Sequence, residues 1–167
     1  MKIVMDVGYD ETKANAASLS FQNWNDSQPI TSHKNIIQNI AAYEPGQFFK
    51  RELPCLLEAL KNYDLKKVDT IIVDGFVWLN SDRKKGLGIY LFEALDKKIP
   101  IIGVAKRKFH GENIFMKTIE RGESKNPLFI TAEGIDVQQA AHLIQSMHGK
   151  FRIPTLLKEV DQLSRAW

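Results

Sequence analysis

Ile3-Val4-Met5-Asp6-Val7, near the start of the chain, is an apolar run interrupted by a single acid. Such a run predicts a buried β-strand, because near-continuous apolar and β-branched residues suit a strand that is covered on both faces. The segments Ala16 to Phe21 and Ile30 to Ile36 can pair with it as antiparallel neighbours, since a turn-prone stretch separates the two. We therefore expect three strands before the first helix.

A fourth strand is predicted from Val68 to Val73, a β-branched run that ends in Asp74-Gly75. The segment before it has leucines at helical spacing, and Pro54 among them is tolerated only in a first turn, so a helix is expected to begin near Glu52. These leucines are Leu53, Leu56, Leu57 and Leu60. The loop Tyr43-Glu44-Pro45-Gly46 precedes this helix.

The rest of the chain continues with alternating helix and strand signals. A helix with one apolar stripe is expected at Leu87 to Leu95, and a buried strand at Pro100 to Ala105. A hairpin is expected from Ile114 to Ile119 with Leu128 to Thr131, and a further helix from Asp136 to Met147. Asp136 can cap its helix, with Gln139 placed as in a capping box.

The order of elements is three strands, helix, strand, helix, strand and then additions. This order predicts an α/β fold of the RNase H-like type, a mixed β-sheet flanked by helices, whereas a flavodoxin-like domain would alternate from its start. With 167 residues, 44% of them hydrophobic, the chain suits a single domain over residues 1–167.

The charge of the chain is mild, and its basic residues are unevenly distributed. The net charge is +3, and basic residues gather at Arg83-Lys84-Lys85, at Lys106-Arg107-Lys108 and at Lys150 with Arg152. Each cluster taken alone is a solvated face, and a net charge this mild does not by itself identify a partner. Nucleic acid, DNA or RNA, is expected as the partner from the phosphodiester chemistry and the resemblance given below. No apolar run is long enough to cross a membrane, so we expect a cytoplasmic protein without a membrane partner, and a monomer. Cys55 is expected to be a small buried residue.

Three acids stand where burial makes a charge unfavourable. Asp6 lies within an apolar strand, Asp74 ends another, and Glu52 begins an apolar helix. If the first and fourth strands are neighbours, Asp6 and Asp74 lie side by side, and a cation stabilises two adjacent carboxylates. Oxygen ligands favour Mg²⁺, with Mn²⁺ as the alternative, and such a site suits phosphodiester hydrolysis. Alternatively, each acid is an ordinary strand-end or capping residue.

A fourth acid, Asp161, lies on a short C-terminal helix that Thr155 can cap. Leu157, Val160 and Asp161 follow the spacing of one helix face, so this carboxylate could reach the same metal. The equally weighted alternative is a surface acid that pairs with Lys158.

Five segments together resemble the endonuclease V family across nearly the whole chain. In order they are Asp6-Val7-Gly8-Tyr9, Tyr43-Glu44-Pro45-Gly46 continuing into Lys50-Arg51-Glu52-Leu53-Pro54, Val73-Asp74-Gly75, Gly103-Val104-Ala105-Lys106, and Phe151-Arg152-Ile153-Pro154 leading to Asp161. The resemblance implies a metal-dependent endonuclease of DNA repair that acts beside a deaminated purine, hypoxanthine or inosine.

The resemblance also implies a role for particular residues. Metal ligands would be Asp6, Glu52, Asp74 and Asp161, catalytic residues Asp6, Glu52, Asp74 and Lys106, and substrate contacts Tyr9, Tyr43, Pro45, Gly46, Gly75 and Arg83. Tyr43 and Pro45 would belong to a wedge that fills the gap left by a flipped base.

Two segments depart from the family pattern. The wedge reads Ala42-Tyr43-Glu44-Pro45 in place of Pro-Tyr-Ile-Pro, and Phe76 to Asp82 replaces a stretch that shapes the base pocket. Two other functions therefore stay open: a nucleic-acid-binding module with weak or lost base-specific cleavage, and another RNase H-like nuclease such as a junction resolvase. No motif encodes a preference between DNA and RNA.

Overall fold

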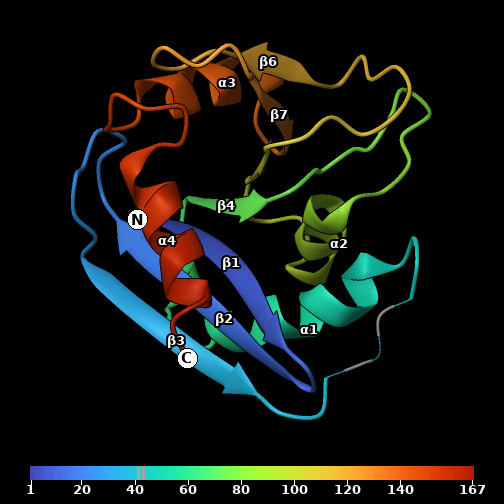
Figure 1. The fold of residues 1–167 in the computed structure, drawn as a ribbon, viewed down its shortest axis with the longest axis vertical. Coiled ribbons are helices and arrows are strands. Elements are labelled where there is room, and N and C mark those ends of the chain that lie inside the picture. Colours follow the sequence, from blue (N-terminus) through green and yellow to red (C-terminus); the bar gives the residue numbers. More distant parts are fainter. Residues whose placement is uncertain (41, 43) are drawn as a thin grey trace.

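The protein is a seven-stranded mixed β-sheet with helices on both faces (Figure 1). This computed structural model describes residues 1–40, 42 and 44–167, except for the side chain of Phe48. The strand order is β3-β2-β1-β4-β5-β7-β6. The strands are β1 (Lys2–Asp10), β2 (Lys13–Phe21), β3 (Thr31–Ile37), β4 (Thr70–Asp74), β5 (Ile101–Ala105), β6 (Lys117–Ile119) and β7 (Leu128–Glu133). The helices are α1 (Phe48–Leu60), α2 (Leu87–Ala94), α3 (Val137–Ser146) and α4 (Thr155–Ser164), with a 3₁₀ turn η1 at Leu65–Lys67.

Strand pairing confirms the predicted RNase H-like arrangement. β1 pairs antiparallel with β2, and β2 with β3, which is the predicted three-stranded start. β4 then lies parallel to β1 on its other side, with Met5 opposite Val73, and β5 lies parallel to β4. The first and fourth strands are therefore neighbours, and their register carries Asp6 to the position beside Asp74.

Each face of the sheet buries its own core. Ile3 and Met5 of β1 pack toward α1 and α2, whereas Val4 packs toward α3 and α4. This alternation follows from the period of two in a strand, and helices cover the apolar residues on both faces of the central strands. Figure 1 shows α4 crossing in front of β1 and β2, with α1 and α2 on the other side of the sheet. Cys55, a residue of α1, is buried in the core between this helix and the sheet, as expected.

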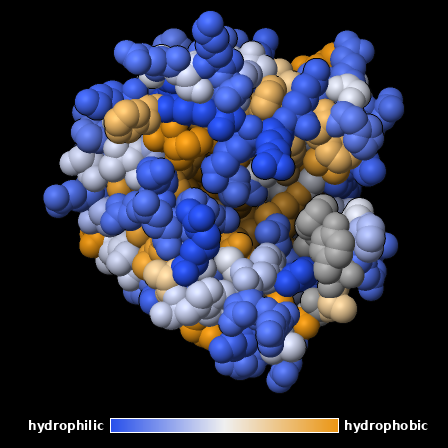
Figure 2. All heavy atoms as spheres, in the orientation of Figure 1, coloured by the Kyte–Doolittle hydropathy of each residue, from blue (hydrophilic) through white to orange (hydrophobic). Residues whose placement is uncertain are grey.

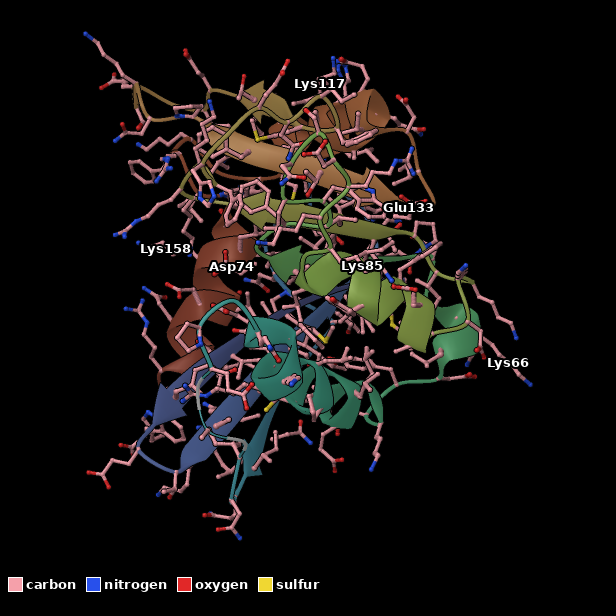
Figure 3. All side chains as sticks on the ribbon, turned by 90° about the vertical axis from the view of Figure 1, so that its right-hand side faces the viewer. Lys66, Asp74, Lys85, Lys117, Glu133 and Lys158 are labelled. Atoms are coloured by element: carbon pink, nitrogen blue, oxygen red, sulfur yellow. The ribbon has the colours of Figure 1, made fainter. Side chains whose placement is uncertain are left out.

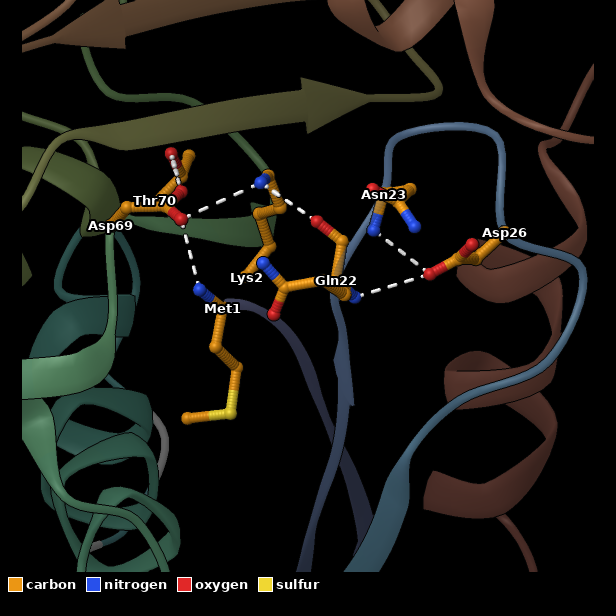
Figure 4. Close-up of polar contacts among 7 residues, drawn as sticks. All are labelled: Met1, Lys2, Gln22, Asn23, Asp26, Asp69 and Thr70. Atoms are coloured by element: carbon orange, nitrogen blue, oxygen red, sulfur yellow. Dashed lines mark hydrogen bonds and ion pairs between the residues drawn. The ribbon is translucent and has the colours of Figure 1, made fainter.

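Polar contacts fix the start of β1 to the neighbouring segments (Figure 4). The Asp69 amide donates to the carbonyl of Met1 over 2.9 Å, immediately before β4 begins. The Lys2 ammonium donates to Gln22 O and to Asp69 Oδ2 at 2.9 and 3.4 Å. These contacts set the register of β1 against β4 at the end of the sheet far from Asp6 and Asp74.

The predicted start of α1 was wrong by about a turn. The helix begins at Phe48, so Pro54 lies inside it. A proline there removes one backbone hydrogen bond, but its ring is exposed, so solvent can reach the carbonyl that loses its partner. The apolar face of Leu56, Ala59 and Leu60, packed on the sheet, outweighs this local cost.

Two smaller predictions also need correction, and a third is confirmed. Thr155 is the first residue of α4 rather than its cap, because Pro154 occupies the N-cap and the Thr155 hydroxyl bonds to His148 Nδ1. The hairpin strand predicted from Ile114 begins only at Lys117, since Ile114 donates its amide to Ser81 Oγ in a loop contact. Asp136 does cap α3 by accepting from the amide of Gln139.

In the described part of the chain, every helix is too short or too polar to span a bilayer.

Candidate active site

The middle of β1, the last residue of β4 and the residue after β5 bring three charged side chains to one face of the sheet. Position by position along the strands, Asp6 follows Val4, Asp74 follows Ile72, and Lys106 follows Val104 at a spacing of two. The three apolar residues all point toward the face that α3 and α4 cover. Asp6, Asp74 and Lys106 therefore point to that same face and line a small cavity beneath α4.

Helix α4 contributes a further acid to this cluster. The Lys106 ammonium lies 3.8 Å from Asp74 Oδ2 and 4.0 Å from Asp161 Oδ1, so one cation bridges carboxylates of a strand and a helix. Asp161 also accepts from the Arg165 guanidinium at 2.7 Å. The alternative partner Lys158 is thus wrong: the helical ion pair of Asp161 is formed with Arg165. Figure 3 shows Asp74 between α4 and the pair α1 and α2.

Glu52 approaches Asp6 and Asp74 from α1. With Asp6 and Asp74 it lines a cavity of about 10 Å³ whose walls are otherwise apolar. A space of this size holds about one water molecule. Three carboxylates from three separate elements therefore surround a volume that suits a single small ligand.

Burial makes the charged forms of these acids unfavourable. Burial, and then the neighbouring Asp74, raises the pKa of Asp6 to about 8. Burial and Asp74 likewise raise the pKa of Glu52 to about 7. Asp74 is 42% exposed, and partial burial raises its pKa while the Lys106 ammonium lowers it. A positive charge placed among the three carboxylates would stabilise their ionised forms.

The residues at this site suit a divalent cation by type. All candidate ligands are carboxylates, and oxygen ligands are those that Mg²⁺ and Mn²⁺ prefer. Within residues 1–40, 42 and 44–167, however, no three acidic, histidine or cysteine side chains converge closely enough to form a ready-made metal cluster. The carboxylates would have to turn toward one another to share an ion.

A larger pocket of about 450 Å³ opens directly beside the acids. Glu52 and Asp74 form part of its wall, and its volume lies within the range of small-molecule sites. Figure 2 shows hydrophobic side chains recessed among hydrophilic ones near the centre of this face. The other lining residues are Gly46, Phe49, Gly75, Phe76, Leu79, Lys84, Lys85, Gly86, Leu87, Tyr90, Phe109 and His110.

Aromatic rings give this pocket a flat wall. Phe49 of α1 and Tyr90 of α2 stack with their centroids 3.9 Å apart and their planes 15° apart. Phe109 adds a third ring, with the Lys84 ammonium 5.6 Å from its centroid. An apolar pocket with flat walls and cations at its mouth suits a planar ring that bears electronegative atoms.

A model of the endonuclease V family matches residues 3–133, which include Asp6, Glu52, Asp74 and Lys106. This chain belongs to the endonuclease V family.

Relatives in the endonuclease V family are distant. The enzyme of Sulfolobus acidocaldarius is 33% identical over 96 residues, 58% of this chain and 43% of the relative. That of Ignicoccus hospitalis is 24% identical, covering 97% of this chain and 80% of the relative. The chain thus spans less than half of the first relative but most of the second.

Solved endonuclease V structures share the fold. The Ciona intestinalis protein, bound to a 23mer DNA that contains an inosine followed by a ribo-adenosine, superposes with a TM-score of 0.82 at 16% identity and covers 98% of this chain and 83% of that one. The catalytic domain of the human protein gives 0.76 at 22% identity, over 98% and 80%. At these identities the likeness establishes the fold.

The structure brings most of the predicted site residues of this endonuclease V chain together. Asp6, Glu52, Asp74 and Lys106 line the two small cavities described above, and Asp161 lies beside Lys106. Gly46 and Gly75 line the large pocket, where Gly75 adopts φ +126°. Pro45 is exposed beside Gly46, and Tyr43 lies outside the described residues.

Two predicted substrate contacts, Tyr9 and Arg83, do not line the large pocket. Tyr9 is covered by the Arg51 guanidinium, 3.8 Å from its ring, and is not part of the pocket wall. Arg83 packs over Phe115 and Trp78 at 4.6 and 5.4 Å, so its neighbours Lys84 and Lys85 face the pocket instead. Their roles in substrate binding stay predictions.

Sequence reasoning missed the aromatic wall. Phe49 lies four residues after Pro45 and Tyr90 four after Gly86, so only the packing of α1 on α2 brings them together. His110 also lines the pocket, next to Phe109. A tertiary contact between two helices leaves no local sequence signal. The available hint was that Phe49 and Tyr90 each follow a glycine, Gly46 or Gly86, within four residues.

Proposed function

We propose that this chain is a divalent-metal-dependent endonuclease that recognises a deaminated purine and hydrolyses a nearby phosphodiester. The observation that carries this proposal is the shared wall: Glu52 and Asp74 belong both to the carboxylate cluster and to the 450 Å³ pocket. A base held in the pocket therefore places its own backbone near the acids.

Asp6, Glu52, Asp74 and Asp161 are the proposed ligands of Mg²⁺, with Mn²⁺ as a substitute. When bound, the ion would activate water and neutralise charge on the phosphate. Lys106 sits between Asp74 and Asp161 and is able to donate to a phosphate oxygen from there. Its ammonium would shield the substrate's negative charge from the carboxylates.

The pocket is the proposed site of a flipped base. The stacked Phe49 and Tyr90 offer an aromatic face, and Lys84 offers a donor to an electronegative ring substituent such as the oxygen of hypoxanthine. The Ciona relative was solved with an inosine-containing DNA, which supports the same class of base. Tyr43, with Pro45, is the proposed wedge in the strand that the base leaves.

The proposal extends to the protein's setting. We expect a monomer in the cytoplasm that acts in DNA repair, with RNA as a possible second substrate class. The 2′-hydroxyl contacts that separate the two nucleic acids belong to the bound complex.

Cleavage of matched strands tests the proposal. Inosine-containing and undamaged DNA and RNA strands are incubated with the protein in Mg²⁺, in Mn²⁺ and in EDTA, and products are mapped on a gel. A cut near inosine that depends on the metal is expected. Binding without cleavage would favour the binding-module alternative, and cleavage of branched DNA that ignores inosine would favour a resolvase.

A further inference from the structure

Phe151 is the most exposed large hydrophobic side chain among the described residues, at 68%. Single exposed apolar residues are ordinary on protein surfaces. Phe151 differs because of the backbone that carries it and because of where that backbone leads. Both features point to a residue that is presented to a ligand.

A buried arginine holds the Phe151 loop. Arg121, only 4% exposed, donates from Nη1 to the carbonyl of Phe151 at 2.6 Å and to that of Arg152 at 3.3 Å. Its Nη2 donates to the carbonyls of Met147 and Gly149 at 2.7 and 2.9 Å. Four carbonyls of one short loop therefore converge on one guanidinium.

A close backbone contact supports this arrangement. A Cβ at Gly122, whose φ is +64°, would stand 2.5 Å from the carbonyl oxygen of Lys150, so only glycine permits the approach. The loop is thus packed against the protein on its carbonyl side, and the Phe151 ring faces solvent from a fixed backbone. A fixed backbone lowers the entropy lost when the ring binds a partner.

The same loop continues directly into the active site. Arg152 Nη2 donates to the carbonyl of Lys106 at 2.6 Å and to that of Pro127 at 3.0 Å. Ile153 lines the small cavity together with Asp6, Asp74 and Lys106. The exposed ring is therefore one residue from a side chain that touches the backbone of the proposed phosphate-binding lysine.

The surroundings of the ring are basic. The Lys150 ammonium lies 5.5 Å from the Phe151 centroid, and Lys106, Arg107 and Lys108 follow across the Arg152 contact. An exposed aromatic ring flanked by cations is the arrangement by which proteins bind single-stranded nucleic acid, with bases stacked on rings and phosphates near cations.

We infer that Phe151 is a second stacking platform, which binds an unpaired nucleobase of the substrate strand outside the 450 Å³ pocket. The inference rests on the proposed function, because it places a strand across Lys106. It concerns a different residue, a different base and a different surface from the pocket of α1 and α2.

Strand binding without cleavage tests this platform. The probe is a short fluorescein-labelled single-stranded DNA of mixed undamaged sequence, and its Kd is measured by fluorescence anisotropy in EDTA. Phe151→Ala should weaken binding about tenfold, equivalent to about 1.4 kcal/mol, within the range for base–aromatic stacking. Phe151→Tyr should stay within about twofold of the wild type, since it keeps the ring.

Ile30→Ala is the matched control. Ile30 is 60% exposed, and its amide bonds to Ser20 at the end of the sheet far from the acids. It should bind the probe like the wild type, and all three variants should keep the wild-type Tm. Probes shortened stepwise from either end should lose the Phe151 dependence at one length, which locates the stacked base.

Two outcomes would overturn the inference: a Phe151→Ala Kd within about twofold of the wild type, or an equal loss in Ile30→Ala. The proposed function fails separately, in the cleavage assay. A chain that binds strands through Phe151 but leaves inosine strands uncut refutes only that function, and one that cuts them with no Phe151 dependence refutes only the platform.

Discussion

The surrounding protein disfavours the ionised form of Asp6, and the proposed reaction requires that form. Burial raises its pKa from 3.8 to about 8, so the folded chain favours the protonated form. The stability that this preference supplies is fully present below about pH 4 and is lost as the pH rises through about 8. At higher pH the ionised carboxyl therefore lowers the stability of the metal-free chain.

Asp6→Asn should abolish cleavage yet raise the Tm in EDTA above pH 8. The expected increase is at least about 2 °C, the shift per kcal/mol for a chain of this size. Asp74→Ala should also abolish cleavage without unfolding the chain. Thermal unfolding across pH measures the first effect and a Mg²⁺ cleavage assay the second.

Asp69→Asn is the control for the sign of this effect. Asp69, which immediately precedes β4, has its pKa lowered by hydrogen bonds to Thr70 and to the amino group at Met1, although burial acts in the opposite direction. Its charged form is favoured, so the variant should gain no stability at high pH. Near wild-type turnover in Asp6→Asn would remove Asp6 from the proposed metal site.

Lys106 is expected to act on the chemical step. Its ammonium contacts Asp74 and Asp161, whereas Arg107 and Lys108 next to it are exposed. Lys106→Met should therefore lower kcat more than it raises KM, and Lys108→Met should mainly raise KM. Single-turnover and steady-state rates on an inosine strand separate the two effects. Equal losses in both variants would indicate generic charge.

Tyr43 tests the wedge, which no contact in the described residues bears on. If its ring fills the gap left by a flipped base, Tyr43→Ala should lose about 1 to 3 kcal/mol on duplex inosine and much less on single-stranded inosine. Tyr43→Phe should restore activity on both. Rates on the two substrates measure this, and equal impairment on both would make Tyr43 a turn residue.

At the scale of elements, the position of Asp161 depends on how α4 is seated against β1 and β2. The Asn15 amide, fully buried on β2, donates to the carbonyls of Leu163 and Ser164 at the end of α4, at 3.0 and 3.1 Å. Gly8, opposite Asn15 in register, leaves room for the helix: a Cβ there would lie 2.2 Å from the Ser164 oxygen.

Asn15→Ala should therefore destabilise the chain and reduce cleavage. It leaves helix carbonyls buried without a donor, which costs about 1 to 3 kcal/mol. Asn35→Ala, on the adjacent strand β3, removes only an exposed contact with Asn62 and should cost about 0.5 kcal/mol or less. Urea unfolding of both variants measures the difference in the free energy of unfolding. An equal loss in both would show that the contacts of Asn15 with α4 are unimportant for stability.

The elements also show what the sequence could and could not predict. Strand order was predictable, because each β-branched run carries its own local signal and β1 next to β4 follows from the fold class. The start of α1 and the cap of α4 were not, because packing of Leu56 and Leu60 and of Leu157 and Val160 overrides the local preferences of proline and threonine.

The same distinction between local signals and tertiary packing applies to the candidate site. Asp6, Glu52 and Asp74 stood out as acids in apolar surroundings, which a sequence displays directly. The Phe49–Tyr90 stack and the Arg121 contacts depend on residues 26 to 41 positions apart, and neither has a local pattern.

For the molecule as a whole, folding and ion binding are expected to be linked. A ligand that binds only the folded state raises stability with its concentration. Mg²⁺ should therefore raise the wild-type Tm above its value in EDTA, and the gain should grow with pH as Asp6 and Glu52 ionise. Calorimetric scans at several Mg²⁺ concentrations test this, with Ca²⁺-free buffer and Asp6→Asn as the control that should respond weakly. An equal response in both proteins would locate the ion elsewhere.

The register of β1 against β4 has a consequence for how such a chain can change over generations. Side chains alternate between faces, so one residue inserted or deleted between Lys2 and Met5 would turn Asp6 away from Asp74 and toward the opposite core. Exchanges among isoleucine, valine and methionine in that stretch preserve the spacing. Lineages descended from this sequence should therefore vary freely in the identity of these apolar residues and hold their number constant.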